Sequence, residues 1–232
     1  MKVSANVATY PGREKALALM LESIKGQFDV VRVYHNECKD CSIVSGSIMD
    51  HVFDYTTAGN NADNGKFYAL DIITEPEIYC TLDDDLRYPP NYREQLEKAV
   101  NEFGCIVSYH GRRIHGTGFN FYKGTTQFPC LGTVHESEII DVVGTGVCAF
   151  DTRYFHPKGL ADSPDLRMSD LVFSLEAAKQ GKQMGVLKHD VGWIKYLGRE
   201  GVIKETIYET ESRKGCKRQN EIADEIYKLR YE

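Results

Sequence analysis

Three consecutive carboxylates, Asp83, Asp84 and Asp85, follow the apolar run at residues 78–82 and precede a proline pair at 89–90. The run is typical of a buried strand, and in open α/β sheets ligands bind outside the carboxyl ends of strands. Adjacent like charges repel one another, so the triple favours a bound cation. Carboxylate oxygens suit Mg²⁺ or Mn²⁺, which in turn suit phosphate oxygens. The alternative is a solvated acidic turn that complements the N-terminus of the next helix.

The elements that would position this triple alternate between strand and helix along the first hundred residues. Period-2 and β-branched patterns predict strands at residues 3–7, 28–34, 51–53 and 78–82. Residues 58–65 have loop composition, and helical spacing predicts helices at 17–24, 66–73 and 92–103. This order favours an α/β fold in which helices cover both faces of a mostly parallel sheet.

The second half of the chain is less regular. It contains predicted strands at 105–109 and 183–187, two short apolar runs within 139–150, and a final helix at 220–230. A further helix is expected at 169–180, with Ser169 as its N-cap. The long polar, glycine-rich stretch 110–129 predicts a loop over a site. Because there is no internal repeat or low-complexity linker, we expect a single domain over residues 1–232.

Composition narrows the class of protein. Hydrophobic residues make up 42% and charged residues 27% of the 232-residue chain, which excludes a disordered polymer or a fibre. A net charge of −6 makes nucleic acid an unsuitable main partner. No apolar stretch approaches the roughly 20 residues of a membrane span, and the N-terminus has no signal-peptide pattern. We therefore expect a soluble, cytoplasmic protein.

Two smaller features bear on partners and compartment. Seven scattered cysteines, an odd number, suit free thiols in a reducing compartment. The basic tail residues are Arg213, Lys214, Lys217 and Arg218. They fit a solvated helix face or, alternatively, weak contact with an anionic membrane surface.

Other chemistries have little support in the sequence. Cys38 and Cys41 are a close pair, but no second pair follows at zinc-finger spacing. The histidines His110, His115 and His135 match no compact set of metal ligands. The sequence contains neither a phosphate-binding P-loop nor the nucleophile elbow of a serine hydrolase.

The acidic motif belongs to a wider pattern that resembles a known family. Asp83-x-Asp85 at a strand end resembles the DXD motif of GT-A fold glycosyltransferases. Residues 7–13 (VATYPGR) and 21–27 (LESIKGQ) resemble the strand-then-"TYNR" opening and the "L-x-S-L-x-x-Q" signature of glycosyltransferase family 2. The resemblance covers residues 3 to about 197. It implies a GT-A fold (Rossmann-like, nucleotide-diphospho-sugar transferase) with a nucleotide-sugar half at 1–104, an acceptor half at 105–200 and a helical tail at 201–232.

The resemblance also implies a donor site. The residues it assigns to the nucleotide sugar are Thr9, Tyr10, Arg13, Asn36, Asn64, Lys66, Asp83 and Asp84. Asp85 would bind the Mn²⁺ or Mg²⁺ ion that bridges the diphosphate, with His189 as the remaining protein ligand. Where the family commonly has a pair of aspartates after the second strand, this chain has Asn36 and Glu37.

An inverting transfer needs a base that takes the proton of the acceptor hydroxyl. The segment 168–181 resembles the family's "E-D-x-D-L" helix start, which implies Asp170 as this base, with Asp162 and Asp165 as alternatives. The residues expected on the acceptor side are Gly144, Thr145, Gly146 and Trp193. Trp193 suits a core position equally well.

We therefore expect a metal-dependent glycosyltransferase that moves a sugar from a nucleotide sugar, with a UDP-sugar as the leading candidate, to a carbohydrate acceptor with inversion. The implied context is the synthesis of glycans or surface polysaccharides. One alternative is a sugar nucleotidyltransferase, although its long basic loop is replaced here by the short segment 10–13. The other is a carbohydrate-binding protein that kept the fold without turnover.

Overall fold

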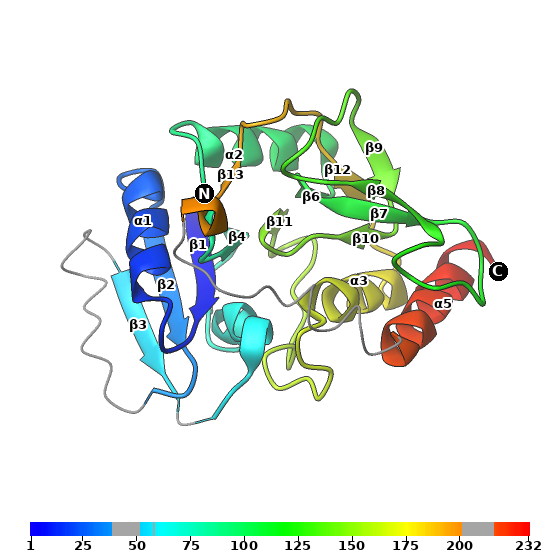
Figure 1. Ribbon diagram of the computed structural model, residues 1–232, viewed down its shortest axis with the longest axis horizontal. Coiled ribbons are helices and arrows are strands. Elements are labelled where there is room, and N and C mark those ends of the chain that lie inside the picture. Colours follow the sequence, from blue (N-terminus) through cyan, green and yellow to red (C-terminus); the bar gives the residue numbers. More distant parts are fainter. Residues whose placement is uncertain (39–51, 58, 201–215) are drawn as a thin grey trace.

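Among the residues that the computed structural model describes (1–38, 52–57, 59–200 and 216–232), eight strands form one mixed sheet (Figure 1). The strands of this sheet are β1 (Lys2–Thr9), β2 (Val30–His35), β3 (Val52–Thr56), β4 (Glu77–Asp83), β6 (Ile106–Ser108), β9 (Glu138–Ile140), β11 (Val147–Asp151) and β12 (Met184–Val186). Their spatial order is β3-β2-β1-β4-β11-β6-β12-β9, so both halves of the chain contribute strands.

The strand pairings confirm the prediction of a mostly parallel sheet. β3, β2, β1 and β4 are parallel neighbours, and β12 is parallel to β6. β11 runs antiparallel to both β4 and β6, and β9 is antiparallel to β12. The parallel order 3-2-1-4 is compatible with a Rossmann-like arrangement, in which ligands bind at the carboxyl edge of the strands.

Helices cover both faces of the sheet, as expected. The helices are α1 (Glu14–Ile24), η2 (Ala62–Asp71), α2 (Tyr92–Phe103), α3 (Ser169–Lys179), η3 (Leu197–Glu200) and α5 (Lys217–Tyr231). Because side chains alternate along a strand, Ile78, Cys80 and Leu82 of β4 pack with α1 and α2, whereas Tyr79 packs with η2 and α3. α5 lies against α3, on the side away from α1 (Figure 1).

The prediction of a loop over residues 110–129 is wrong for its two ends. β7 (Gly111–Ile114) and β8 (Thr125–Phe128) pair with each other and, through β7, with β10 (Val142–Val143) in a small antiparallel sheet. A side chain at Gly111 would lie 2.1 Å from Ile140 Cδ1 and 2.7 Å from the Val142 carbonyl oxygen. This glycine therefore permits close strand packing within the stretch that was expected as a loop.

Three local predictions need correction. The helix expected from residue 66 begins at Ala62, inside the segment expected as a loop. Met168, not Ser169, holds the N-cap position of α3, because the Ser169 hydroxyl contacts Asp63 in η2. Helical spacing predicts Phe103 on one face with Tyr92, Leu96 and Ala99, but Phe103 is 54% exposed and so does not belong to the packed face of α2. In addition to the two sheets described above, β5 (Leu86–Arg87) pairs antiparallel with β13 (Lys195–Tyr196).

The predictions about the cysteines and the basic tail can be compared with the structure only in part. Cys38 is disulfide-bonded, so the expectation of free thiols is wrong there and Cys38 is not available to zinc. Elsewhere in the described part of the chain, Cys80, Cys105, Cys130 and Cys148 are free thiols. Cys41, Arg213 and Lys214 lie outside the described residues. Within the described parts of the chain, no helix combines the length and apolar character that a membrane crossing requires.

Candidate active site

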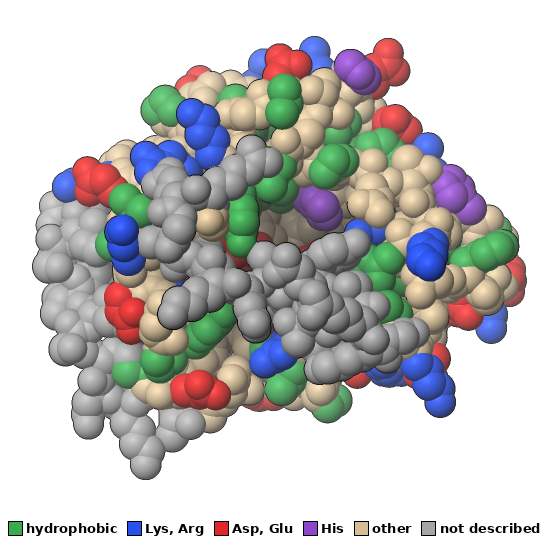
Figure 2. Space-filling model, viewed as in Figure 1, with side chains coloured by type: hydrophobic (Ala, Val, Ile, Leu, Met, Phe, Trp, Pro, Cys, Tyr) green, Lys and Arg blue, Asp and Glu red, His purple; other side chains and the backbone are tan. Residues whose placement is uncertain are grey.

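A cleft of about 960 Å³ lies at the carboxyl ends of β1 and β4, a size suited to a nucleotide-sized ligand. Figure 2 shows the hollow on this face of the molecule, with acidic side chains at its floor. Eight of the predicted site residues line it: Tyr10, Arg13, Lys66, Asp83, Asp84, Asp85, Thr145 and Asp170. The structure therefore brings together residues from both halves of the chain.

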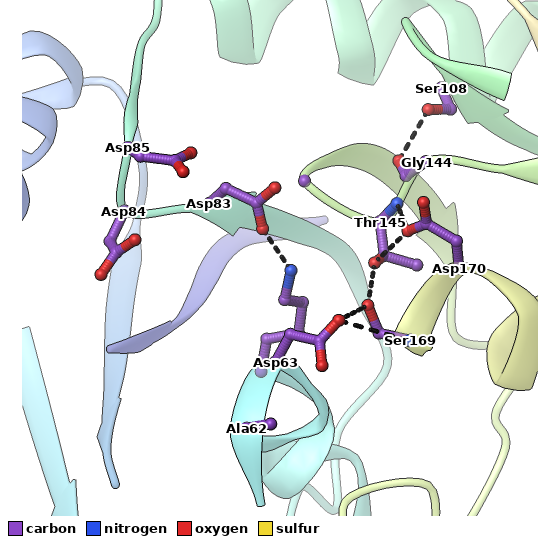
Figure 3. Close-up of polar contacts among 12 residues, drawn as sticks. Ala62, Asp63, Asp83, Asp84, Asp85, Ser108, Gly144, Thr145, Ser169 and Asp170 are labelled. Atoms are coloured by element: carbon purple, nitrogen blue, oxygen red, sulfur yellow. Dashed lines mark hydrogen bonds and ion pairs between the residues drawn. The ribbon is translucent and has the colours of Figure 1, made fainter. Parts of the chain in front are cut away.

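The three aspartates divide into a pair and a single residue. Figure 3 shows Asp83 and Asp85 directed toward the same side, with Asp84 pointing away from both. Asp83 ends β4, whereas Asp84 and Asp85 form the turn that leads from β4 to Leu86. Asp84 is buried and accepts hydrogen bonds from the Thr9 hydroxyl at 2.7 Å and from Arg13 Nε at 3.0 Å. Asp84 thus anchors the first loop to the end of β4, while Asp83 and Asp85 face the cleft.

Two cations offset the charge of the triple. Arg13 Nη2 lies 2.9 Å from Asp85 Oδ2, and Lys66 Nζ forms an ion pair with Asp83 Oδ1. Burial lowers the pKa of Lys66, but its acidic neighbours, Asp83 foremost, outweigh this effect and raise it, so the lysine is protonated. Burial, together with the charges of Asp83 and Asp84, raises the pKa of Asp85 to about 6.

The donor set of the pair fits a divalent cation held jointly with phosphate. In the described ranges, no three His, Cys, Asp or Glu side chains form a complete metal centre. Asp83 and Asp85, with side chains 41% and 23% exposed, each place only one oxygen in an ion pair with another described residue. Mg²⁺ is commonly bound through one or two carboxylates, with phosphate and water completing its shell. These two residues would therefore supply the protein's share of the ligands.

His189 is not placed as a ligand of this metal. Its Nδ1 lies 2.8 Å from the Leu187 carbonyl oxygen and its Nε2 lies 3.2 Å from the Pro129 carbonyl oxygen. A backbone bridge to Val134 holds the residue there, outside the lining of the cleft. The histidine that lines the cleft is His110, and its burial lowers its pKa.

The expected acceptor-side residues mostly serve packing. A side chain on Gly146 would lie 2.0 Å from Asp83 Oδ2, so the bare backbone there makes room for that carboxylate and not for a sugar. A Cβ on Gly144 would lie 2.6 Å from the Cβ of His110, so the His110 side chain fills the space beside Gly144. Trp193 packs against Tyr109, with ring centroids 4.4 Å apart, and belongs to the core cluster. Thr145 alone of this group lines the cleft.

Asn36 and Asn64 are buried behind the cleft. Asn36 donates to the carbonyl oxygens of Thr9 and Ala62 at 3.1 and 2.9 Å, which ties the first loop to the start of η2. Asn64 donates to the Asp165 carbonyl oxygen at 3.3 Å. In place of Asn36 and Asn64, Glu37 and Asn60 line the cleft and are joined by a 2.7 Å hydrogen bond.

Asp170 lies at the other wall, in the first turn of α3. Its Oδ1 accepts hydrogen bonds from the backbone N–H and the hydroxyl of Thr145, both at 2.7 Å. The Ser108 hydroxyl donates to the Gly144 carbonyl oxygen at 2.9 Å and so steadies the Thr145 segment. Figure 3 shows Asp83 and Asp170 coming from opposite sides toward the same space. The alternatives Asp162 and Asp165 do not line the cleft.

Sequence reasoning placed the stretch 110–129 over a site but named none of its residues as part of one wall of the cleft. It is formed by residues from the stretch expected as a loop: His110, Arg112, Phe121, Tyr122 and Gln127. The Arg112 guanidinium lies over both aromatic rings, 4.9 Å and 5.2 Å from their centroids. The segments 111–114 (GRRI) and 125–128 (TTQF) have no alternation of apolar and polar residues that would have revealed these strands. Asp63 was also missed, because its partners are distant in sequence.

No protein-family model matches the chain, and no curated protein matches its sequence. The function has to be inferred from the cleft itself. That cleft presents a pair of carboxylates beside two cations, and a hydrogen-bonded carboxylate opposite them. This arrangement can hold a phosphorylated ligand and take a proton from a second molecule.

Proposed function

We propose that the protein is a metal-dependent glycosyltransferase that transfers a sugar from a nucleotide sugar to an acceptor hydroxyl with inversion, on a GT-A type sheet. The observation that carries the proposal is the placement of Asp83 and Asp85 opposite Asp170 across one cleft. Among the described residues that line the cleft, the His110 ring accepts from the Cys130 backbone N–H and makes none of the hydrogen bonds to a serine or cysteine side chain that a hydrolase of those types would need. The mixed, mostly parallel sheet is compatible with the GT-A arrangement.

The donor would bind on the side of β1 and β4. Its base and ribose would contact Tyr10, Glu37 and Asn60, and its diphosphate would lie beside Arg13 and Lys66. Asp83 and Asp85 would hold Mn²⁺ or Mg²⁺, which offsets the negative charge that develops on the departing nucleoside diphosphate. Arg13 is fixed by its bonds to the buried Asp84, so its charge is oriented before the donor arrives.

Asp170 would take the acceptor proton. Its Oδ1 is occupied by Thr145, which leaves Oδ2 to accept the proton of the attacking hydroxyl. The bond from the acceptor oxygen to the anomeric carbon forms as the bond to the diphosphate oxygen breaks on the opposite face. Attack from the side opposite the leaving group inverts the configuration at that carbon.

The acceptor would contact the wall of Arg112, Phe121 and Tyr122. Aromatic rings offer flat apolar faces to a sugar, and the guanidinium above them adds donors at their edge. This wall adjoins Asp170 in the lining of the same cleft. A carbohydrate acceptor therefore suits the chemistry of this side.

Calorimetric titration of UDP with and without Mn²⁺ tests the donor site. We expect metal-dependent binding, weakened at least about tenfold in Asp85→Asn because one of two protein ligands is lost. Asp190→Asn is the matched control, since Asp190 is exposed and does not line the cleft. If the affinity for UDP changed neither on removal of Mn²⁺ nor in Asp85→Asn, the proposed metal site would be contradicted. If no nucleotide bound at all, the proposed function would be refuted.

A further inference from the structure

A chain of hydrogen bonds joins the two walls of the cleft, from Asp63 in η2 to Asp170 in α3 (Figure 3). The Ser169 hydroxyl makes a short contact with Asp63 Oδ2 and lies 2.8 Å from the Thr145 hydroxyl oxygen. The Thr145 hydroxyl in turn lies 2.7 Å from Asp170 Oδ1. Two carboxyl groups are thus connected by two hydroxyls through three successive oxygen–oxygen contacts.

Counting hydrogens shows that this chain needs one more proton. Each of the three contacts requires a hydrogen between its oxygens, and an ionised carboxylate can only accept. The hydroxyls of Ser169 and Thr145 supply two hydrogens. With both carboxyl groups ionised, one pair of buried oxygens would face each other with no hydrogen between them. A proton on one of the two carboxyl groups removes this conflict.

The surroundings place that proton on Asp63. Asp170 Oδ1 already accepts two hydrogen bonds from Thr145, the environment of an ionised carboxylate. Asp63 Oδ1, in contrast, is buried with no hydrogen-bond partner among the described residues, which costs much more for a charged oxygen than for a neutral carbonyl.

The charges around Asp63 agree with this assignment. Burial raises the pKa of Asp63, and the negative charges of Asp170 and Asp83 act in the same direction. Lys66 and the contact with the Ser169 side chain oppose them without reversing the shift. Lys66 also directs its ammonium group to Asp83 Oδ1.

We propose that Asp63 is a positioning residue that is protonated and holds Asp170 as an ionised base through the hydroxyls of Ser169 and Thr145. The inference rests on the proposed function, in which Asp170 takes the acceptor proton. Asp63 O–H donates to Ser169, Ser169 donates to Thr145, and Thr145 donates to Asp170. This fixed direction keeps Asp170 Oδ1 as an acceptor and leaves Oδ2 facing the cleft.

Two substitutions at Asp63 test the direction of the chain. Asp63→Asn keeps an uncharged donor toward Ser169, whereas Asp63→Leu removes the donor at similar size. For metal-dependent hydrolysis of a UDP-sugar, we expect about a 100-fold loss of kcat in Asp63→Leu, with little change in KM, because the base loses its alignment. The kcat of Asp63→Asn should be at least about tenfold higher than that of Asp63→Leu. Equal kcat values in the two variants would overturn the positioning role.

A second measurement needs no turnover. The infrared difference between wild type and Asp63→Asn at neutral pH should contain the carbonyl band of a protonated carboxylic acid, shifted in D₂O. A carboxylate band in its place would overturn the assignment of the proton. The infrared readout tests the proton on Asp63 without any nucleotide sugar. The UDP titration of the wild type tests the proposed function separately, so the failure of one can be told from the failure of the other. If Asp63→Leu does not fold, Thr145→Val should give the same loss of kcat, and an unchanged kcat would refute the chain.

Discussion

Gly146→Ala is the perturbation whose effect can be worked most directly from the structure. The added Cβ would lie 2.0 Å from Asp83 Oδ2 and 2.4 Å from its Cγ, whereas unstrained contacts begin near 3.4 Å. The Asp83 carboxylate must therefore move by more than 1 Å, or the β4–β11 edge must separate. A misplacement of about 1 Å in a catalytic site costs on the order of 10²-fold in rate. The same overpacking destabilises a folded core by about 1–3 kcal/mol.

The assay is metal-dependent hydrolysis of UDP-sugars, combined with calorimetric binding of UDP and Mn²⁺. We expect Gly146→Ala to fold, with a lowered Tm, and to lose about 100-fold in hydrolysis. Gly185→Ala is the matched control, because its Cβ would meet the Glu138 carbonyl oxygen at an ordinary 3.5 Å. Full hydrolysis in Gly146→Ala would refute the reasoning, since Asp83 could then be displaced without consequence.

Three further predictions follow from the same contacts. His189→Gln should leave Mn²⁺-dependent UDP binding unchanged, because both ring nitrogens face backbone carbonyl oxygens outside the cleft; loss of that binding in calorimetry would contradict this placement. Glu77→Leu should lower the free energy of unfolding by about 3 kcal/mol, since Arg32 would be left buried without its counter-charge. Urea unfolding measures this loss, and an unchanged midpoint would show that the buried pair is not needed. Removal of divalent cations with a chelator should abolish UDP binding in calorimetry and Mn²⁺ should restore it; binding that survives chelation would contradict the role of Asp83.

The parts of the site that could be predicted are those fixed by local sequence. Asp83 ends a buried strand and Asp85 lies in the turn directly after it, so local sequence places both at the same end of that strand. Asp170 stands in the first turn of a helix whose apolar spacing was visible. In each case the residue type and its neighbours within one element were sufficient.

The parts that could not be predicted depend on contacts between distant segments. His189 is held by its bridge to Val134, and no periodicity within its own segment reveals that bridge. Gly111 lay in a stretch expected as a loop, and its close approach to Ile140 depends on the tertiary arrangement. The bonds from Ser169 to Asp63 likewise join α3 to η2, and they replaced the expected helix cap.

The stereochemistry of nucleotide-sugar hydrolysis tests the central claim most directly. With water as the acceptor, Mn²⁺ present and UDP-glucose or UDP-galactose as the donor, proton NMR identifies the first anomer released. We predict the inverted anomer from the wild type, and a loss of about 10²–10⁴-fold in Asp170→Asn with UDP binding retained. Release of the retained anomer, or full hydrolysis by Asp170→Asn, would contradict a base at Asp170 acting opposite a donor held by Asp83 and Asp85.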